Sequence, residues 1–347
     1  MRSILLGKTG LTVSELGFGG IPIIRLDFDS AVRVVRRACE RGITIFDTAN
    51  AYRDSEAKIG SALEGMRDKV ILATKTLRRD AEGALEQLEN SLRMLRTDYI
   101  DIYQLHQIAQ DRDWEIASGP SGALEALIKA REKGWIRYIG VTSHNLAMAI
   151  KLVKTGIFAT IQFPFNFIED AARHELFTTA HAMDMGVLAM KPFAGGVIDN
   201  AAIAFKFLRD YRHVIPLPGF DAVERVDEVS AFYYNPNTVT KEDRQRMDQY
   251  RLELGKQFCR RCEYCQPCPQ GVMITSAMGY KIIASRMSAE VAVDFARVPM
   301  ESVLKCTDCK ECIERCPYEL PIPDMLKAFY DLYELHRQAL GRNDGSW

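Results

Sequence analysis

Eight short apolar runs recur along the first two thirds of the chain, and most of them lead into a segment with helical patterning. The runs cover residues 15–19, 44–47, 70–75, 99–106, 137–142, 160–163, 187–190 and 214–217. Strands rich in Val and Ile that each precede a helix imply parallel strands joined by crossovers. Eight such units in roughly 220 residues predict a (β/α)8 TIM barrel. A doubly wound open sheet is the weaker alternative, because Gly17-Phe18-Gly19-Gly20 after the first strand lacks the spacing G-x-G-x-x-G.

Eight of the nine cysteines lie in two runs near the C-terminal end. In the first run, two residues separate successive cysteines: Cys259, Cys262, Cys265 and Cys268. The second run has the same spacing except for a final gap of three residues: Cys306, Cys309, Cys312 and Cys316. The second run, followed by Pro317, is the C-x2-C-x2-C-x3-C-P signature of bacterial ferredoxins, in which the fourth cysteine ligates the other cluster. The ninth, Cys39, is expected to be a packing residue.

The spacing therefore predicts two [4Fe-4S] clusters with crossed ligands. One takes Cys259, Cys262, Cys265 and Cys316, and the other takes Cys306, Cys309, Cys312 and Cys268. The first run differs from the signature because two residues, not three, precede Cys268, which leaves the place of that cysteine less firmly defined. Zinc held by paired C-x2-C knuckles is the alternative, but zinc sites usually use two pairs rather than two runs of four. Helical patterning between the runs predicts a small α-helical ferredoxin-like domain.

Charge and hydropathy narrow the choice of partners. Lys and Arg total 45 against 46 Asp and Glu, so the sequence predicts no nucleic-acid surface. No uncharged apolar stretch reaches the roughly 18–20 residues of a membrane helix, and the N-terminal apolar segment is too short for a signal peptide. These patterns predict a cytoplasmic protein without a membrane partner, in which cysteines need a reason other than disulfides. The sequence further predicts a barrel over residues 1–235, a helical connector over 236–256 and the cluster domain over 257–347.

The carboxyl ends of three neighbouring predicted strands carry reactive side chains. Asp47, Lys75 and His106 end the second, third and fourth strands, and Tyr52 lies in the loop after Asp47. Because catalytic groups of such barrels sit at these strand ends, the four side chains are predicted to meet at one rim. A phenol titrates near pKa ~10, and a buried ammonium beside it lowers that pKa. The set suits proton donation by Tyr52 to a carbonyl oxygen while a cofactor delivers hydride.

These segments resemble the tetrad segments of the aldo/keto reductase family. The likeness rests on Phe46-Asp47-Thr48-Ala49-Asn50-Ala51-Tyr52, Ala73-Thr74-Lys75-Thr76 and Asp101-Ile102-Tyr103-Gln104-Leu105-His106. The opening residues 6–11 and 13–19 also match, as the hairpin that closes the floor of the barrel. The whole chain resembles the branch of that family with an appended 4Fe-4S domain, for which Lys191-Pro192-Phe193-Ala194-Gly195-Gly196 is typical.

The resemblance implies NADP(H), or less often NAD(H), bound across the rim. By position, Thr142, Ser143 and Gln162 would hold the nicotinamide carboxamide, while the loop with Lys191 and Gly195 would lie near the pyrophosphate. Arg225 would lie near the adenosine end. Departures from the family pattern leave the cofactor preference open; they are Ser143 in place of Asn, Met190 in place of a stacking Tyr, and Gly219-Phe220 in place of a Lys-Ser pair. Trp114, in the predicted loop 107–118, is expected to wall the substrate pocket or to anchor that loop.

Three functions compete at this stage. The intact tetrad favours a reductase of carbonyl compounds, or a dehydrogenase of alcohols, whose clusters are structural or serve a redox partner protein. The alternatives are an electron-transfer protein that uses the barrel as a docking module, and a subunit that senses the redox state of the nucleotide. A hydride carries two electrons whereas each cluster passes one. Coupling between the two sites therefore needs a mediator such as a flavin, for which the sequence shows no binding feature.

Overall fold

The computed structural model describes residues 1–254, 258–285 and 287–341. It divides into two compact units, Met1–Asp248 and the chain from Gln249 onward, and each unit is considered by itself. Helix α10 (Lys241–Leu254) lies within the segment 236–256 for which the sequence predicts a connector, and the boundary between the units falls inside this helix. Residues 256 and 257, where the sequence placed the start of the cluster domain, lie outside the described residues. None of the described helices is long and apolar enough to cross a membrane.

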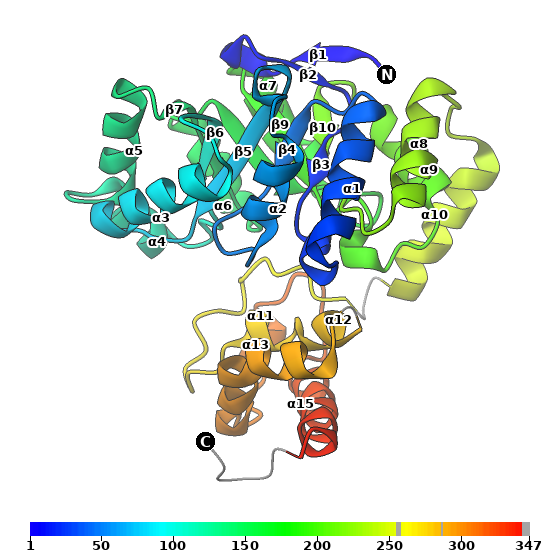
Figure 1. Ribbon diagram of the computed structural model, residues 1–347. Coiled ribbons are helices and arrows are strands. Elements are labelled where there is room, and N and C mark those ends of the chain that lie inside the picture. Colours follow the sequence, from blue (N-terminus) through cyan, green and yellow to red (C-terminus); the bar gives the residue numbers. More distant parts are fainter. Residues whose placement is uncertain (255–257, 286, 342–347) are drawn as a thin grey trace. The chain divides into compact units, whose positions relative to one another are not determined.

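The first unit is built on the eight predicted parallel strands (Figure 1). In sheet order they are β3 (Phe18–Gly19), β4 (Ile45–Asp47), β5 (Ile71–Thr76), β6 (Ile100–Leu105), β7 (Ile136–Thr142), β8 (Thr160–Pro164), β9 (Gly186–Met190) and β10 (Val214–Pro216). Backbone bonds close the sheet on itself, because the amide of Gly17 donates to Pro216 at 2.9 Å and that of Gly19 to Pro218 at 2.7 Å. Gly19 has no room for a Cβ beside the Leu217 carbonyl, so glycine permits this closure. The predicted barrel is confirmed.

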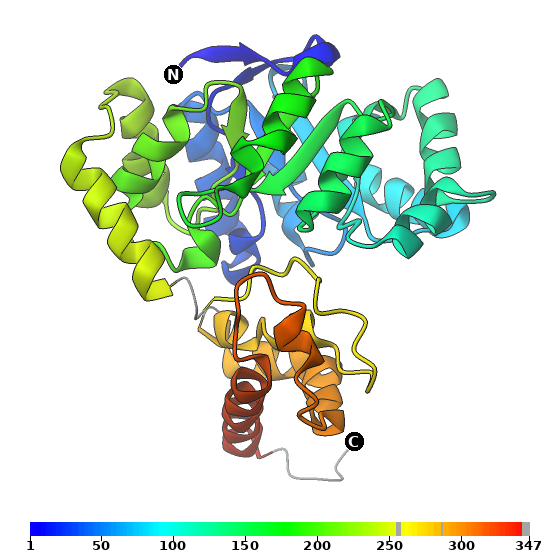
Figure 2. The same ribbon diagram turned by 180° about the vertical axis from the view of Figure 1, so that it is seen from behind.

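Helices surround the strands in both views of the first unit (Figures 1 and 2). They are α1 (Phe28–Glu40), α2 (Ser55–Ala62), α3 (Ala81–Met94), α4 (Asp111–Ser118), α5 (Ala123–Glu132), α6 (Leu146–Lys154), α7 (Glu175–Ala182), α8 (Ala201–Arg209) and α9 (Val223–Tyr234). Several begin on a side-chain cap; Asp80, for example, accepts the amide of Gly83 at 2.7 Å. On α1, Arg37 pairs with Asp227 of α9 at 2.8 Å, while Val34, Val35 and Ala38 are buried.

An N-terminal hairpin seals one end of the barrel. Strands β1 (Ser3–Leu5) and β2 (Thr12–Ser14) pair antiparallel around the Gly7–Thr9 turn that the sequence predicts. Leu6 and Val13 from this hairpin join a buried cluster with Ile45, Ile102 and Ile215, which come from the barrel strands. Because this apolar floor closes the end at which the strands begin, the carboxyl ends of the strands remain as the face on which a site can form.

The second unit is helical, as predicted, and has no strand among its described residues. Its helices are α11 (Ile274–Ala277), α12 (Tyr280–Ala284), α13 (Ala289–Ser302), α14 (Glu311–Glu314) and α15 (Ile322–Ala339). The last of these, α15, packs along α13. The Tyr280 hydroxyl and His336 Nδ1 form a hydrogen bond of 2.8 Å between α12 and α15. This small core holds the two cysteine runs at its edge.

Candidate active site and cluster-binding loops

The barrel brings the four predicted catalytic side chains to one rim. Asp47 is the last residue of β4, Lys75 lies near the end of β5, and His106 follows β6 directly. Tyr52 reaches the same place from the loop between β4 and α2. Hydrogen bonding between neighbouring strands sets this convergence, because Asp47 pairs with Ala73 on β5 and Lys75 with Gln104 on β6. Chain positions up to 59 residues apart therefore share one small volume.

A buried ion pair lies at the centre of the rim. The Lys75 ammonium donates to Asp47 Oδ2 at 2.7 Å and to the carbonyl of Thr48 at 2.5 Å, and Lys75 is only 1% exposed. Burial raises the pKa of Asp47, while the charge and hydrogen bond of Lys75 act against that rise. The pair therefore keeps a positive charge fixed inside the barrel, at the cost of desolvating both partners.

Tyr52 and His106 lie beside this charge. Lys75 Nζ is 5.2 Å from the centroid of the Tyr52 ring, and the rings of Tyr52 and His106 meet edge to face at 5.7 Å. Burial lowers the pKa of His106 well below its usual range, and the charges of Lys75 and Arg79 add to the effect. The imidazole is thus neutral near pH 7 and offers one N–H donor and one acceptor. Its Nδ1 is buried and has no hydrogen-bond partner among the residues that the structure describes.

Sequence reasoning missed one member of this site, Gln104. Its side-chain amide donates to Asp47 Oδ1 at 3.2 Å and to Gln162 Oε1 at 3.0 Å, and Gln162 in turn donates to Asp47 Oδ2 at 3.2 Å. Both amides therefore support the carboxylate that holds Lys75. The signal was present in the strand period, because Gln104 stands two residues before His106 and so points to the same side of β6.

Two of the predicted carboxamide contacts, Thr142 and Ser143, are engaged with nearby backbone. The Thr142 hydroxyl accepts the amide of Gln107 at 2.8 Å, and Ser143 Oγ accepts that of Asn145 at 3.1 Å. Thr142, Ser143 and Gln162 all lie at the carboxyl ends of β7 and β8 and face the rim on which the tetrad stands. The hydroxyl groups of Thr142 and Ser143 accept backbone amides in the loops after β6 and β7. Gln162 instead bonds directly to the Asp47 carboxylate.

The other residues that are predicted to contact the nucleotide lie in two places. Met190 ends β9, and Lys191 and Gly195 follow it in a segment where Lys191, Ala194, Gly195 and Gly196 all adopt positive φ. The carbonyl of Lys191 is held by Asn166 Nδ2 at 3.0 Å. Arg225, in the first turn of α9, pairs with Glu228 at 2.8 Å. The structure brings the first three together beside the rim and engages Arg225 in a surface ion pair.

Trp114 does not lie in a loop, as the sequence led us to expect. Residues 111–118 form α4, whose acidic first turn suits a helix N-terminus. The indole packs edge to face on Phe158 with ring centroids 5.8 Å apart. Phe158 precedes β8 and is fully buried, so Trp114 anchors α4 to the barrel. Of the two roles considered for this residue, the packing contact is the one observed.

The cysteines of the first predicted quartet gather in the second unit. Burial, together with Cys259, Cys262 and Cys316 nearby, raises the pKa of Cys265 to about 12. Cys265 and Cys316 belong to the buried core of this unit, and Cys259 packs against it. The Cys265 thiol would ionise only beside a strong positive charge, which iron would supply. Cys316 thus lies with the first run, as the crossed assignment requires.

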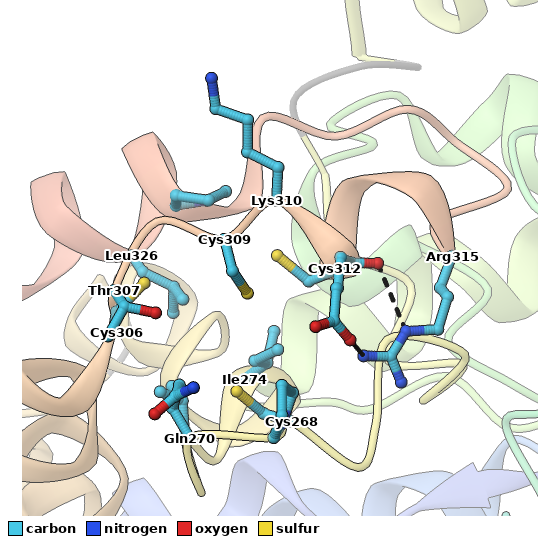
Figure 3. A pocket seen from close by; sticks show the side chains of 14 residues that line it. Cys268, Gln270, Ile274, Cys306, Thr307, Cys309, Lys310, Cys312, Arg315 and Leu326 are labelled. Atoms are coloured by element: carbon cyan, nitrogen blue, oxygen red, sulfur yellow. Dashed lines mark hydrogen bonds and ion pairs between the residues drawn. The ribbon is translucent and has the colours of Figure 1, made fainter.

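The four cysteines of the second quartet line one pocket. Figure 3 shows the sulfur atoms of Cys268, Cys306, Cys309 and Cys312 turned toward this common space, with Cys268 arriving from the other run. Arg315 at its edge bonds to Glu311 at 3.2 Å and to the carbonyl of Pro267 at 3.0 Å. Four thiols from two separate segments therefore line one common space.

The two cysteine loops repeat one backbone conformation. Residues on either side of the second cysteine adopt positive φ in both runs: Arg261 (58°) and Glu263 (65°) in the first, Asp308 (55°) and Lys310 (64°) in the second. Positive φ is uncommon for side chains of this kind, and such strain is concentrated at ligand sites. Turns of this kind form amide-lined concavities that serve many Fe–S sites. The repeat was invisible in the sequence, because none of the four is glycine.

The thiol spacing also bears on the zinc alternative. Four thiolates around one zinc ion lie within about 4 Å of one another, because each is ~2.3 Å from the metal. Among the described residues, no three His, Cys, Asp or Glu side chains are close enough to hold a single metal ion.

The buried pair predicts a marked stability effect. Replacing Lys75→Met should leave the Asp47 carboxylate buried without its counter-charge and lower the free energy of unfolding by about 3–5 kcal/mol, measured by urea denaturation of the full chain. The double variant Asp47→Leu/Lys75→Met should recover most of the loss. Lys129→Met, which breaks an exposed pair with Glu125, serves as the control and should leave the midpoint near that of the wild type. A loss for Lys75→Met no greater than for the control would contradict the role given to the pair.

Comparison with known proteins places both units. The aldo/keto reductase family model matches residues 15–205, and the 4Fe-4S dicluster domain model matches residues 258–320. An aldo-keto reductase of Bacillus subtilis is 29% identical over 278 residues, which cover 72% of this chain and 82% of the relative.

Solved structures share the fold of the barrel. An aldo-keto reductase from Bacillus halodurans, in its holo form, matches with a TM-score of 0.62 at 25% identity over 72% of this chain and 96% of that one. The enzyme from Klebsiella pneumoniae in complex with NADPH matches with a TM-score of 0.59 at 22% identity, over 72% and 95% of the two chains. The chain therefore belongs to the aldo/keto reductase family of NAD(P)H-dependent oxidoreductases and carries a 4Fe-4S domain at its C-terminal end.

Proposed function

We propose that this protein reduces the carbonyl group of a small molecule, or oxidises the corresponding alcohol, with Tyr52 as the acid–base group. The observation that carries the proposal is the Lys75 ammonium, which is fixed by Asp47 at 2.7 Å and lies 5.2 Å from the Tyr52 ring. A neighbouring cation favours the phenolate, so it eases proton release from Tyr52 to a developing alkoxide. A general acid, its activating charge and a neutral imidazole then face one reacting carbonyl.

A nicotinamide dinucleotide would supply the hydride at this rim. The residues here fit such a group, since the buried Nδ1 of His106 has no partner among the described residues and the segment from Lys191 to Gly196 turns through positive φ. His106 orients the substrate carbonyl by donating a hydrogen bond to its oxygen. Tyr52 gives that oxygen a proton, and Lys75 stabilises the phenolate that remains. Asp47 keeps Lys75 in place throughout.

The cofactor contacts are proposed by position. Thr142, Ser143 and Gln162 would border the carboxamide, with Met190 beside the ring. Lys191 and Gly195 would lie near the pyrophosphate. Phe220 is buried against Phe18, with ring centroids 5.6 Å apart, so it offers nothing to a 2′-phosphate. Arg225 remains the cation for that end, and NADPH is the cofactor present in the related Klebsiella structure.

Substitution Tyr52→Phe tests the role of the phenol. The loss of one general acid should lower kcat for carbonyl reduction by about 10²–10⁴-fold, because the alkoxide receives no proton. Nucleotide binding, followed by fluorescence quenching, and cluster absorbance should stay near wild type. The matched control is Tyr99→Phe, whose ring packs against Arg67 at 3.9 Å before β6 begins. Full turnover in the Tyr52 variant would refute the assignment.

The amide network makes a second prediction, on pH dependence. Gln104→Leu removes one donor that counters the burial of Asp47, so the pKa of Asp47 should rise further. A carboxyl with a raised pKa takes up its proton at a higher pH and then no longer pairs with Lys75. The acidic limb of the kcat/KM profile should therefore move to higher pH. Gln87→Leu, at a glutamine that bonds Thr76 and not Asp47, should leave the profile unchanged; equal profiles for both variants would disprove the role of Gln104.

The C-terminal unit is proposed to hold two [4Fe-4S] clusters in the crossed arrangement. Their ligands would be Cys259, Cys262, Cys265 and Cys316, and Cys268, Cys306, Cys309 and Cys312. The convergence of the second quartet on one pocket supports this assignment. Such clusters need reduced thiols, as found in the cytoplasm, where we place the protein. Electron transfer through this unit to a redox partner protein is the second candidate function, favoured by the exposure of Cys306 and Cys309.

Anaerobic purification with iron and sulfide analysis separates these functions. We expect about eight iron per chain, because each cluster holds four. Bleaching of the visible spectrum by NADPH would place the clusters on the electron path of the nucleotide, through a flavin or a partner. If NADPH leaves the spectrum unchanged, with and without added flavin, while carbonyl turnover continues at full rate, the clusters do not lie on the electron path of the nucleotide.

A further inference from the structure

The two cysteine quartets differ in their access to solvent. Cys265 and Cys316 are 6% and 9% exposed and belong to the core of the C-terminal unit. Cys306 and Cys309, in contrast, are exposed. The quartets differ in exposure because the chain folds differently around each of them.

A continuous exposed segment accounts for the openness of the second quartet. Every residue from 304 to 311 is exposed, and the side chain of Leu304 reaches 69% exposure. The segment leaves the end of α13, carries Cys306 and Cys309, and ends where α14 begins. Positive φ at Asp308 and Lys310 turns the chain around the pocket, so that its outer side remains in solvent.

Two cysteines of the first quartet, Cys265 and Cys316, are buried in the core of their own unit, whereas Cys259 and Cys262 are half-buried. Cys265 packs in one core cluster with Val272, Ile274 and Leu320, among others. Cys316 follows α14, where its amide donates to the carbonyl of Ile313 at 3.0 Å, and it is part of the same cluster. An apolar shell of this kind limits the approach of water and solutes to a metal group.

We propose that the cluster on Cys268, Cys306, Cys309 and Cys312 exchanges electrons with soluble one-electron carriers, and that the other cluster is shielded from them. This inference rests on the proposed function for the presence of both clusters. Electron transfer slows steeply as the distance through protein grows, so a carrier reacts through the cluster whose ligands it can approach. In each exchange the reduced cluster loses one electron, the carrier gains it, and no proton or bond needs to move.

Differential alkylation of the anaerobic holoprotein tests this directly. The wild-type protein, without nucleotide or carbonyl substrate, is treated with an iron chelator and iodoacetamide, and labelled peptides are measured by mass spectrometry over time. We expect two phases of iron release of about four iron each. Cys306 and Cys309 should be labelled in the fast phase, at least about fivefold ahead of Cys265 and Cys316. Labelling of both pairs at one rate, or in the reverse order, would overturn the proposal.

Variants that each retain one cluster provide an independent readout. Cys262→Ser should keep the exposed cluster and Cys309→Ser the shielded one, and both are reduced with dithionite. A soluble dysprosium complex should speed the electron-spin relaxation of the cluster in Cys262→Ser several-fold more than in Cys309→Ser. If the relaxation is equally fast in the two variants, or faster in Cys309→Ser, this inference is wrong. The proposed reductase function is not affected by that result, because the assay needs no reductase activity. Iron near zero in the wild type would overturn cluster binding itself, and this inference with it.

Discussion

The ion pair between Lys75 and Asp47 is the interaction on which the chemistry of this barrel depends. Two opposite charges buried in a protein interior stay ionised only when hydrogen bonds compensate the lost water. The closed sheet provides these bonds from several strands at once, through Thr48 after β4, Gln104 on β6 and Gln162 on β8. An open sheet would not bring β8 against β4. Closure at the glycine-lined seam between β3 and β10 is therefore a condition for the fixed positive charge beside Tyr52.

The barrel and its tetrad were predictable because both depend on short, local sequence patterns. Short apolar runs marked all eight strands, and the reactive side chains stand at or near strand ends, where position in the sequence determines position at the rim. Contacts between distant strands were harder to foresee. Gln104 stood inside a recognised motif, yet only its bonds to Asp47 and Gln162 give it a role. Similarly, Arg225 was assigned by position, and its pairing with Glu228 depends on side-chain geometry.

Segments without strong hydrophobic periodicity were predicted less accurately from the sequence. The stretch 107–118 looked like a loop, but a helix forms over Asp111–Ser118 because tertiary packing of Trp114 on Phe158 outweighs its weak amphipathic pattern. The boundary of the barrel unit lies inside α10, since a continuous charged helix gives no compositional break. In the cysteine loops, spacing sufficed to group the thiols, whereas their exposure follows from the packing of α11 to α15 and could not be read from the spacing.

The crossed ligand sets have a mechanical consequence for the small unit. Each proposed cluster ties the segment that ends at Cys268 to the segment that begins at Cys306, so both close the same intervening length of chain. The entropy needed to close that length is spent when the first cluster forms. The second then assembles between ends that are already held at high local concentration. The second cluster of this unit should accordingly form more readily than the first.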